Sequence, residues 1–250
     1  MIRGFYTAAS GMYTQQKKTN VFSNNIANVG TSGYKKDRLI SSTFSQELVM
    51  RLEKDNPQNF GKFDIIKHPD EVFTDYAQSD FDFSGRPYDM AIMGDGFFTV
   101  KTPEGEELLT RNGQFGIDEK GFLILRGVGR VQSNRGDIKL PKSDFEVDKN
   151  GTIVTADGKK FQLKIVAPEN KATLSNAFNG TFKDSAPEKQ KELKTGFQIM
   201  KGVYERSNVD VSEEMTRIIE SQRTFQSCSQ MVRMIDTSES RLLEKMGSGK

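Results

Sequence analysis

The stretch "SNNIANVGTSGYKK", residues 23–36, combines three asparagines, two glycines and a basic tail. Asparagine is a poor helix former because its amide competes for nearby backbone groups, so these asparagines weaken the last turns of a helix that enters the stretch. Gly30 suits the left-handed residue that closes a helix, and Gly33 suits a second reversal just beyond it. The stretch therefore predicts a helix that ends near Val29, a tight bend, and an extended segment led by Tyr34.

The residues before this stretch follow a helical pattern. Apolar and small polar side chains recur at steps of three and four, as on one face of a helix; they are Ile2, Phe5, Ala9, Met12, Gln16, Thr19, Phe22 and Ile26. Polar positions such as Gln16 and Thr19 cost stability in a helix seam, but they can specify its register. An ordinary helix packed on a core would have the same periodicity.

A second, longer helical pattern closes the chain. Residues 211–246 contain neither proline nor glycine, so they predict a helix of about 36 residues and about 54 Å. This is about three times the average helix of a globular protein. Asp210 followed by Glu213 predicts a capping box at its start. Its apolar positions are Met215, Ile218, Ile219, Phe225, Cys228, Val232, Ile235, Leu242, Leu243 and Met246.

Between the two helices the sequence changes to short strands. From residue 88 to residue 182, runs such as "GFLIL" and "FQLKIVA" alternate with turn signals such as "RNGQFG" and "ADGKK". Turns at intervals of about 8–12 residues are typical of an antiparallel sandwich or small barrel. A long helix with an interrupted apolar face needs a helical partner, and the first helix is the candidate. We therefore predict an α+β fold, in which the terminal helices pair as a coiled-coil-like stalk and the centre is a mainly antiparallel β domain.

This interpretation divides the chain into five segments. The N-terminal helix and turn pair with the C-terminal helix, and the β domain is reached through a bridge and left through a charged return segment. The expected bounds are 1–35 for the first helix and turn, 36–84 for an extended or irregular bridge, 85–185 for the β domain, 186–204 for the return segment, and 205–250 for the C-terminal helix.

Composition excludes several classes of protein. The 36 basic and 34 acidic residues give a net charge of +2, and no basic face lined with aromatic residues predicts nucleic-acid binding. The single cysteine, Cys228, excludes an internal disulfide framework and is expected to be a small buried residue. No run approaches the roughly 20 apolar residues of a membrane span, and the first residues lack the apolar core of a secretory signal. Composition alone favours a soluble intracellular protein.

No motif predicts catalysis. His68 is the only histidine and precedes Pro69 in an expected loop, without assignable partners for a metal site or a triad. The run "DKNGTIVTADG" resembles a calcium loop, but Gly151 stands at position 4 after Asp148, where an EF-hand needs glycine at position 6. The "GDG" and "GVGR" runs do not lead from a strand into a helix, so they are not phosphate loops. We expect no enzyme activity, no metal site and no cofactor.

Three blocks of the sequence resemble one family. Residues 6–36, "YTAASGMYTQQKKTNVFSNNIANVGTSGYKK", resemble the N-terminal signature of bacterial flagellar axial proteins, the rod and hook family. Residues 85–124 resemble the opening of that family's central β domain, and residues 202–246 resemble its C-terminal signature. The blocks cover about half of the chain, in the family's order and at the expected ends.

The resemblance implies a structural subunit of the flagellar basal-body rod, an axial protein that forms a helical polymer and transmits torque from motor to hook. Family members leave the cell through the flagellar type III export apparatus without a cleaved signal. The implied location is therefore the basal body, outside the cytoplasmic membrane, in place of the intracellular interpretation. The implied partners are copies of the chain, neighbouring rod and hook proteins and the export apparatus, with no nucleic acid and no membrane insertion. Length and the single β module are similar to those of proximal and distal rod proteins.

The family motifs carry over to particular positions. Residues 24–28 match the helix-end motif, 33–35 match the turn after it, and 207–209 match the entry to the C-terminal helix. The hallmark Phe-x-Gln-Gly stands here as Tyr-Ala-Gln-Ser at 76–79. With the helix faces, these matches predict subunit-interface residues: Ile2, Phe5, Met12, Asn24, Asn25, Ile26, Asn28, Gly33, Tyr34, Ser207, Asn208, Val209, Met215, Ile219, Phe225 and Val232.

Two further expectations concern assembly. The asparagines are expected to hydrogen-bond across subunits, where neutral amides avoid the desolvation cost of charges. The terminal helices are expected to become ordered only on assembly, because packing supplies most helical stability. The alternative is a secreted module that binds the cell wall or a carbohydrate and carries a helical stalk. A monomer with ordered helices and a measurable glycan affinity would favour that alternative.

Overall fold

The computed structural model describes most of the chain. The described residues are 2–43, 46–51, 58–64, 67–140, 145–193 and 195–247, with side chains described for 4–40, 71–140, 145–193, 195–244 and 246. They divide into two compact units. The helical unit comprises the chain up to residue 26, residues 37–74 and the chain from residue 210 onward, and the β unit comprises residues 27–36 and 75–209.

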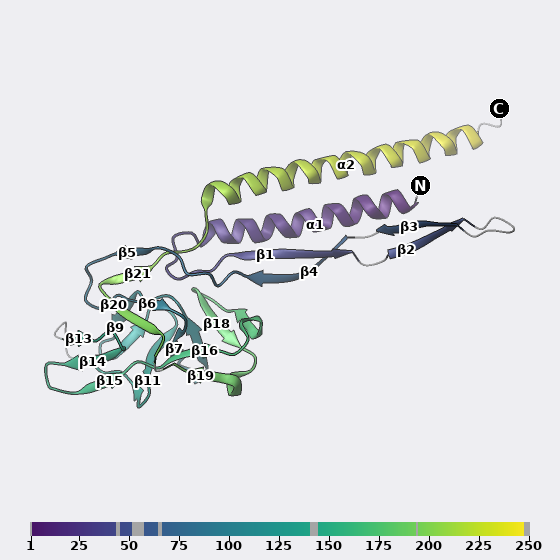
Figure 1. Cartoon of the computed structure of the whole chain (residues 1–250). Coiled ribbons are helices and arrows are strands. Elements are labelled where there is room, and N and C mark those ends of the chain that lie inside the picture. The colour runs from purple at the N-terminus through teal and green to yellow at the C-terminus, as the bar shows by residue number, and fades with distance from the viewer. Residues whose placement is uncertain are drawn as a thin grey trace. The chain divides into compact units, whose positions relative to one another are not determined.

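The described residues of the helical unit form two helices and two antiparallel strand pairs. Helix α1 (Ile2–Ala27) and helix α2 (Val211–Gly247) lie side by side and run antiparallel (Figure 1). Strand β1 (Asp37–Thr43) pairs with β4 (Lys67–Thr74), and β2 (Gln46–Arg51) pairs with β3 (Gln58–Asp64). The predicted pairing of the terminal helices is confirmed.

The start of α2 shows the Asp210 half of the predicted capping box. The Asp210 carboxylate accepts hydrogen bonds from the backbone N–H groups of Ser212 (2.8 Å) and Glu213 (3.3 Å), which satisfies donors that have no partner inside the helix. Glu213 accepts from Arg217 one turn later at 2.6 Å. An aspartate and two glutamates at this end also interact favourably with the helix dipole.

The end of α1 differs in one detail from the prediction. The helix stops at Ala27, and the Asn28 carbonyl closes a turn by accepting from the Thr31 N–H at 3.0 Å. Gly30 does not have a positive φ, so its predicted left-handed conformation is wrong. The turn after the helix closes without a left-handed residue at this position. Gly33 does have positive φ (68°), and the extended backbone begins at Tyr34, as predicted.

The segment between residues 36 and 84 is more regular than the expected irregular bridge. It contains β1 to β4 and also β5 (Phe81–Phe83), which pairs with β21 (Val203–Glu205) in the β unit. Strict alternation of apolar and polar residues arises when one face of a strand is buried. Ile40, Val72 and Phe73 are each about half exposed, so these strands lack the pattern that identifies a strand.

The β unit is built from short antiparallel strands. Every strand pair among its described residues is antiparallel, which confirms the predicted sheet type. Its other strands are β6 (Met90–Gly94), β7 (Phe97–Lys101), β8 (Glu107–Thr110), β9 (Phe115–Ile117), β10 (Leu123–Leu125), β11 (Gly129–Ser133), β12 (Gly136–Asp137), β13 (Phe145–Val147), β14 (Thr152–Thr155), β15 (Lys160–Gln162), β16 (Ile165–Pro168), β17 (Leu174–Asn176), β18 (Thr181–Asp184), β19 (Gln190–Glu192) and β20 (Phe197–Lys201).

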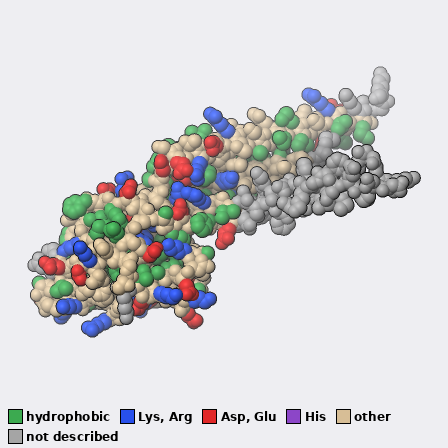
Figure 2. Space-filling model, in the orientation of Figure 1, with side chains coloured by type: hydrophobic (Ala, Val, Ile, Leu, Met, Phe, Trp, Pro, Cys, Tyr) green, Lys and Arg blue, Asp and Glu red, His purple; other side chains and the backbone are tan. Residues whose placement is uncertain are grey.

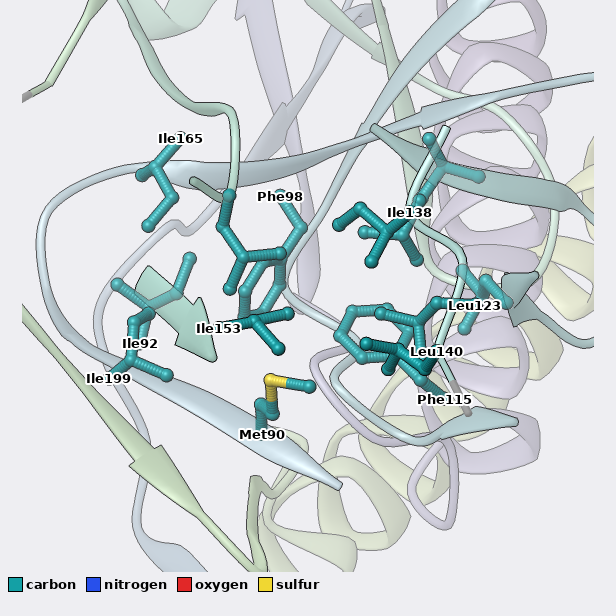
Figure 3. Packing of buried hydrophobic residues seen from close by; sticks show 14 of the residues in the cluster. Met90, Ile92, Phe98, Phe115, Leu123, Ile138, Leu140, Ile153, Ile165 and Ile199 are labelled. Atoms are coloured by element: carbon teal, nitrogen blue, oxygen red, sulfur yellow. The ribbon is translucent and has the colours of Figure 1, made fainter. Parts of the chain in front are cut away.

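A hydrophobic core fills the β unit. Figure 3 shows part of it, where Met90, Phe98 and Ile153 converge from β6, β7 and β14. A smaller cluster forms around Phe97 and Phe182, whose rings meet edge to face at 5.8 Å. The end of the expected return segment takes part in this fold, because β20 pairs along β6 and brings buried side chains to the main core. The β unit therefore has enough buried apolar surface to hold its own fold.

Replacing Gly33 by alanine should destabilise the β unit. A Cβ atom at Gly33 would lie 2.3 Å from the Arg111 carbonyl carbon, so the substitution adds a steric clash to the strain of positive φ, together costing about 1–3 kcal/mol or more. Gly158→Ala is the matched control, because Gly158 has a similar φ (75°) but no atom within 4 Å of the added Cβ. In calorimetric unfolding, G33A should lose clearly more stability than G158A. Equal losses of stability in the two variants would contradict the predicted clash at Gly33.

Candidate functional site

The two helices of the helical unit meet along a regular seam. Antiparallel contacts join Asn25 to Glu214 and place Cys228 over Gly11 and Ile235 over Gly4. The α2 members of this seam are seven or fourteen residues apart, and so are their α1 partners. A seven-residue repeat is the period of a coiled coil. The predicted coiled-coil-like pairing is therefore present in antiparallel form.

Small residues bring the helices close together. A Cβ added at Gly11 would lie only 3.2 Å from the Cys228 sulfur, and one added at Gly4 would lie 3.6 Å from Ile235 Cδ1. Ala8, between the two glycines, is buried. The close approach depends on the absence of side-chain bulk on this face of α1, so a larger residue at Gly11 would force the helices apart.

A polar layer lies in the middle of the seam. Ser221 on α2 is buried, and its hydroxyl group donates to the Gln15 carbonyl oxygen at 2.9 Å. The same hydroxyl lies 3.1 Å from Thr19 Oγ1 and 3.0 Å from Gln15 Oε1. Because these bonds form only in one alignment, the layer selects the register of the two helices.

The contact face of α1 lies one position earlier than the predicted stripe. The observed seam uses Gly4, Ala8, Gly11 and Gln15 in place of the predicted Phe5, Ala9, Met12 and Gln16. Thr19 and Phe22 belong to both faces. Phe5 is 43 % exposed. Periodicity favours the line of largest apolar residues, but here the closest packing follows the line of smallest ones. The prediction of this face was therefore wrong for residues 4–16 and correct at Thr19 and Phe22.

Asn25 has a role within the chain. Its side chain is fully buried, donates to the Asp37 carbonyl oxygen (2.9 Å) and to Glu214 Oε2 (3.0 Å), and accepts from the Asp37 N–H (2.9 Å). One amide thus joins α1, β1 and α2. The expectation that Asn25 hydrogen-bonds across subunits is corrected, because its donor and acceptor groups are used inside the helical unit.

The other expected interface residues differ in exposure. Gly33, Tyr34 and Val209 are buried in their own chain, and Ile2 has its side chain outside the described residues. Only exposed or half-buried residues can present surface to a second molecule. The exposed members are Phe5, Asn24, Met215 and Ile219, and the half-buried members are Met12, Ile26, Asn28, Ser207, Asn208, Phe225 and Val232.

A buried ionic cluster lies in the β unit. The Glu205 carboxylate, fully buried, accepts from Lys35 Nζ at 2.5 Å, from the Ser79 N–H at 3.0 Å and from Arg111 Nη1 at 3.5 Å. Lys35 also donates to the Ala77 carbonyl oxygen at 2.7 Å. We call Lys35, Arg111 and Glu205 the Glu205 cluster. Glu205 and Arg111 could not be identified from the sequence, because nothing in it distinguishes a buried charge from a solvated one.

Burial dominates the electrostatics of the Glu205 cluster. Desolvation lowers the pKa of Lys35 and also that of Arg111, and the attraction of Glu205 offsets each shift only in part. Two cations share one carboxylate, so the backbone carbonyl oxygens around them supply the remaining acceptors, such as Gly94 O for Arg111 Nη2 at 2.8 Å. Removing the carboxylate would leave both cations buried without the carboxylate that attracts each of them most strongly.

Hydrogen bonds around the Glu205 cluster join three segments of the chain. The Gly33 N–H donates to the Glu205 carbonyl oxygen at 2.8 Å. The Asn208 side chain accepts from the Lys36 N–H (2.7 Å) and donates to the Asp75 carbonyl oxygen (2.9 Å). The motifs at 33–35, 76–79 and 207–209, which lie far apart in the sequence, therefore meet at one place in the β unit.

The structure offers no metal or membrane-spanning feature in the part that it describes. Among the described residues, no three or more His, Cys, Asp or Glu side chains are grouped so that they could hold a metal ion. No helix in the described ranges is long and apolar enough to cross a membrane. The side chain of His68 lies outside the described residues.

Replacing Glu205 by glutamine should strongly destabilise the β unit. The free energy of unfolding is expected to fall by about 3–5 kcal/mol, because breaking a buried ion pair leaves uncompensated charge in the interior. Glu107→Gln is the matched control, since Glu107 pairs with Lys164 at 2.9 Å but is 48 % exposed, and such surface pairs contribute about 1 kcal/mol or less. Urea unfolding of the full chain measures the free energy of unfolding of both variants. Similar losses of free energy in E205Q and E107Q would refute the importance of the Glu205 cluster.

Comparison with known proteins places both terminal segments and the β unit in one family. Three family models match: "Flagella basal body rod protein" at residues 5–35, "Flagellar hook protein FlgE/F/G D1 domain" at 91–143, and "Flagellar basal body rod FlgEFG protein C-terminal" at 200–244. In the structure these ranges cover α1 with its turn, the first half of the β unit, and most of α2 with the strands before it.

Similar proteins extend over nearly the whole chain. The chain is 31 % identical over 258 residues to the flagellar basal-body rod protein FlgG of Bacillus subtilis (strain 168), covering 94 % of this chain and 96 % of that protein. It is 27 % identical to the flagellar basal-body rod protein FlgF of Caulobacter vibrioides, covering 93 % of each. It is also 26 % identical to the flagellar hook-basal body complex protein FlhO of Bacillus subtilis, covering 99 % of each. The chain belongs to the family of flagellar basal-body rod proteins.

Proposed function

We propose that the chain is a structural subunit of the bacterial flagellar rod, which assembles with copies of itself and with neighbouring rod and hook proteins into the axial shaft. The observation that carries the proposal is similarity to rod proteins along almost the full length of both chains. The relatives reported above carry rod and hook-basal body names and lend no support to the alternative of a carbohydrate-binding module. The role is mechanical and requires no cofactor and no catalytic chemistry.

Exposed apolar side chains on the helices support assembly. Figure 2 shows hydrophobic side chains at the surface over the C-terminal half of α2. Contiguous exposed apolar surface is uncommon on a soluble monomer and marks interaction sites. The helix residues that are large, hydrophobic and clearly exposed are Phe5, Tyr6, Tyr13, Met215, Ile219, Met231, Met234, Leu242, Leu243 and Met246.

The proposed role requires a filament rather than a closed oligomer. A head-to-tail contact, in which exposed residues of one copy meet a different surface of the next copy, is heterologous. Heterologous contacts that do not close a ring repeat without end and build an open helical polymer. An open helical polymer has the geometry that a torque-transmitting shaft requires.

Ordering of the helices is coupled, in this proposal, to assembly and export. The α1–α2 seam is narrow and partly polar, so packing between the two helices supplies little of the stability that a long helix needs. A chain that orders its ends late is suited to passage through the type III export channel and to delivery outside the cytoplasmic membrane without a cleaved signal peptide. The β unit has a core of its own and does not depend on assembly.

Hydrogen exchange should detect this coupling. In a dilute monomer the backbone amides of α1 and α2 are expected to exchange much faster than those of the strands β6 and β7, and in the assembled filament they are expected to become protected. Circular dichroism at increasing concentration should show a parallel gain of helix. Full protection of both helices in the dilute monomer would overturn the coupling.

The double substitution Asn24→Asp and Asn28→Asp should impair rod assembly. Asn24 is exposed and Asn28 half-buried at the end of α1, so added carboxylates oppose the helix dipole and must be desolvated at any subunit contact. Motility and rod assembly in cells should be lost, whereas calorimetric unfolding of the β unit should keep its midpoint. Asn150→Asp, an exposed turn substitution, is the control. Normal rods in the double variant would show that the subunit contact lies elsewhere.

A further inference from the structure

The sequence contains three Asn–Gly pairs, and all of them lie between strands of the β unit. They are Asn112–Gly113, Asn150–Gly151 and Asn179–Gly180. Asparagine is one of the thermolabile residues, and its side-chain amide is most reactive before glycine, because glycine has no Cβ atom to shield its backbone nitrogen. The three pairs are equivalent in sequence, so the structure around each pair decides which of them reacts.

The reaction turns the side-chain amide into a carboxylate in two steps. Hydroxide removes the proton of the glycine N–H, the nitrogen attacks the asparagine Cγ atom, and the side-chain nitrogen leaves as ammonia with a proton from water. Water then opens the succinimide ring at the bond between nitrogen and Cγ, which gives aspartate, or at the bond between nitrogen and the main-chain carbonyl carbon, which gives isoaspartate. The first step needs a free glycine N–H and an asparagine side chain that is able to turn towards it.

The fold restrains Asn150–Gly151. The Gly151 N–H donates to the Asp148 carbonyl oxygen at 2.8 Å, and Gly151 is buried. The Asn150 carbonyl oxygen accepts from Gln162 Nε2 at 2.7 Å. The nitrogen that would attack is therefore held in a hydrogen bond, and this bond has to break before the ring closes.

The fold also restrains Asn112–Gly113. The Asn112 side-chain oxygen accepts from the Gln114 N–H at 3.0 Å, so a hydrogen bond holds the amide in place. Gly113 is buried, and its carbonyl oxygen accepts from the N–H groups of Met90 (3.0 Å) and Phe115 (2.9 Å). Ring closure at this pair would have to break these contacts.

Asn179–Gly180 forms the exposed tip of the β17–β18 hairpin. Asn179 has a φ of 52° and is the only residue other than glycine with positive φ among those that the structure describes, and this conformation is strained. Its side chain is exposed, and within the described part of the chain neither that side chain nor the Gly180 N–H has a hydrogen-bond partner. Gly180 is anchored through its carbonyl oxygen, which accepts from Thr110 Oγ1 at 2.8 Å. The nitrogen is therefore free to attack.

We propose that Asn179 is the residue of the folded chain that deamidates, and that the fold protects Asn112 and Asn150. Among the described residues, the Asn179–Gly180 pair alone combines a free glycine N–H, an asparagine side chain without hydrogen bonds and a strained backbone. This reaction goes beyond the proposed function and does not depend on it, because it requires water and hydroxide and no partner protein.

Deamidation changes the rim of a groove on the β unit. Phe178, next to Asn179, lines this groove of about 520 Å³ together with Leu125 and Val128. A Cβ atom added at Gly127, which also lines the groove, would lie 3.2 Å from Asn179 Nδ2, so the new carboxylate lies beside the β10–β11 turn. Isoaspartate also lengthens the backbone of the tip by one atom. The groove therefore acquires negative charge and a different shape as the protein ages.

The test follows deamidation in the full-length chain at neutral and at mildly alkaline pH. Peptide mapping by mass spectrometry should show that Asn179 is converted about tenfold or more faster than Asn150 or Asn112, because each of those pairs must first break hydrogen bonds. Both aspartate and isoaspartate should appear at position 179, and the rate should rise with the hydroxide concentration. Equal rates at Asn179 and Asn150 in the folded chain would overturn the proposal.

Guanidinium chloride separates the effect of the fold from that of the local sequence. In the unfolded chain the three pairs should react at similar rates, and a lead of Asn179 that persists in denaturant would refute selection by the fold. As an independent measure, Asn179→Gln should remove most of the ammonia that the folded chain releases, because glutamine would have to close a larger ring. Unchanged ammonia release in N179Q, with the calorimetric unfolding of the β unit preserved, would also refute the proposal.

Discussion

The buried carboxylate of Glu205 is the interaction on which the arrangement of the β unit depends. It binds Lys35, Arg111 and the backbone of Ser79, so it joins the segment that follows α1, the segment that follows β4 and the segment that follows β8. An isolated charge in this position would be very costly, and the surrounding donors make it favourable only when all three segments are in place. The ionic cluster therefore makes the folding of these segments cooperative.

The helical unit follows a different physical rule. Its two helices touch through glycine, alanine and a polar layer around Ser221, while large apolar side chains such as Met234 and Leu243 remain outside. A monomeric protein would be expected to place its largest apolar residues in the seam, where they remove the most surface from water. The opposite arrangement keeps the seam thin and leaves hydrophobic surface exposed, which supports the proposed assembly with other chains.

Parts of this structure follow directly from local sequence. The length of α2 was predictable because residues 211–246 contain no helix breaker, and the Asp210 cap and the reversal at Gly33 were predictable because each depends on a few adjacent residues. The seam face of α1, the strands between residues 37 and 74, and the intramolecular role of Asn25 were not predictable. Each depends on which distant segment packs against the residue, and periodicity carries no information about that partner.

The sequence by itself determined the order of the elements, the antiparallel β centre and the resemblance to flagellar axial proteins, because these depend on spacing, turn residues and motifs that can be read locally. Only the tertiary structure decided that Lys35, Arg111 and Glu205 share one buried site and that Gly11 meets Cys228. The physical reason is that desolvation and close packing are properties of a residue's surroundings. The chain supplies those surroundings from distant segments, as Glu205 shows, which lies 170 residues from Lys35 and 94 from Arg111 in the sequence.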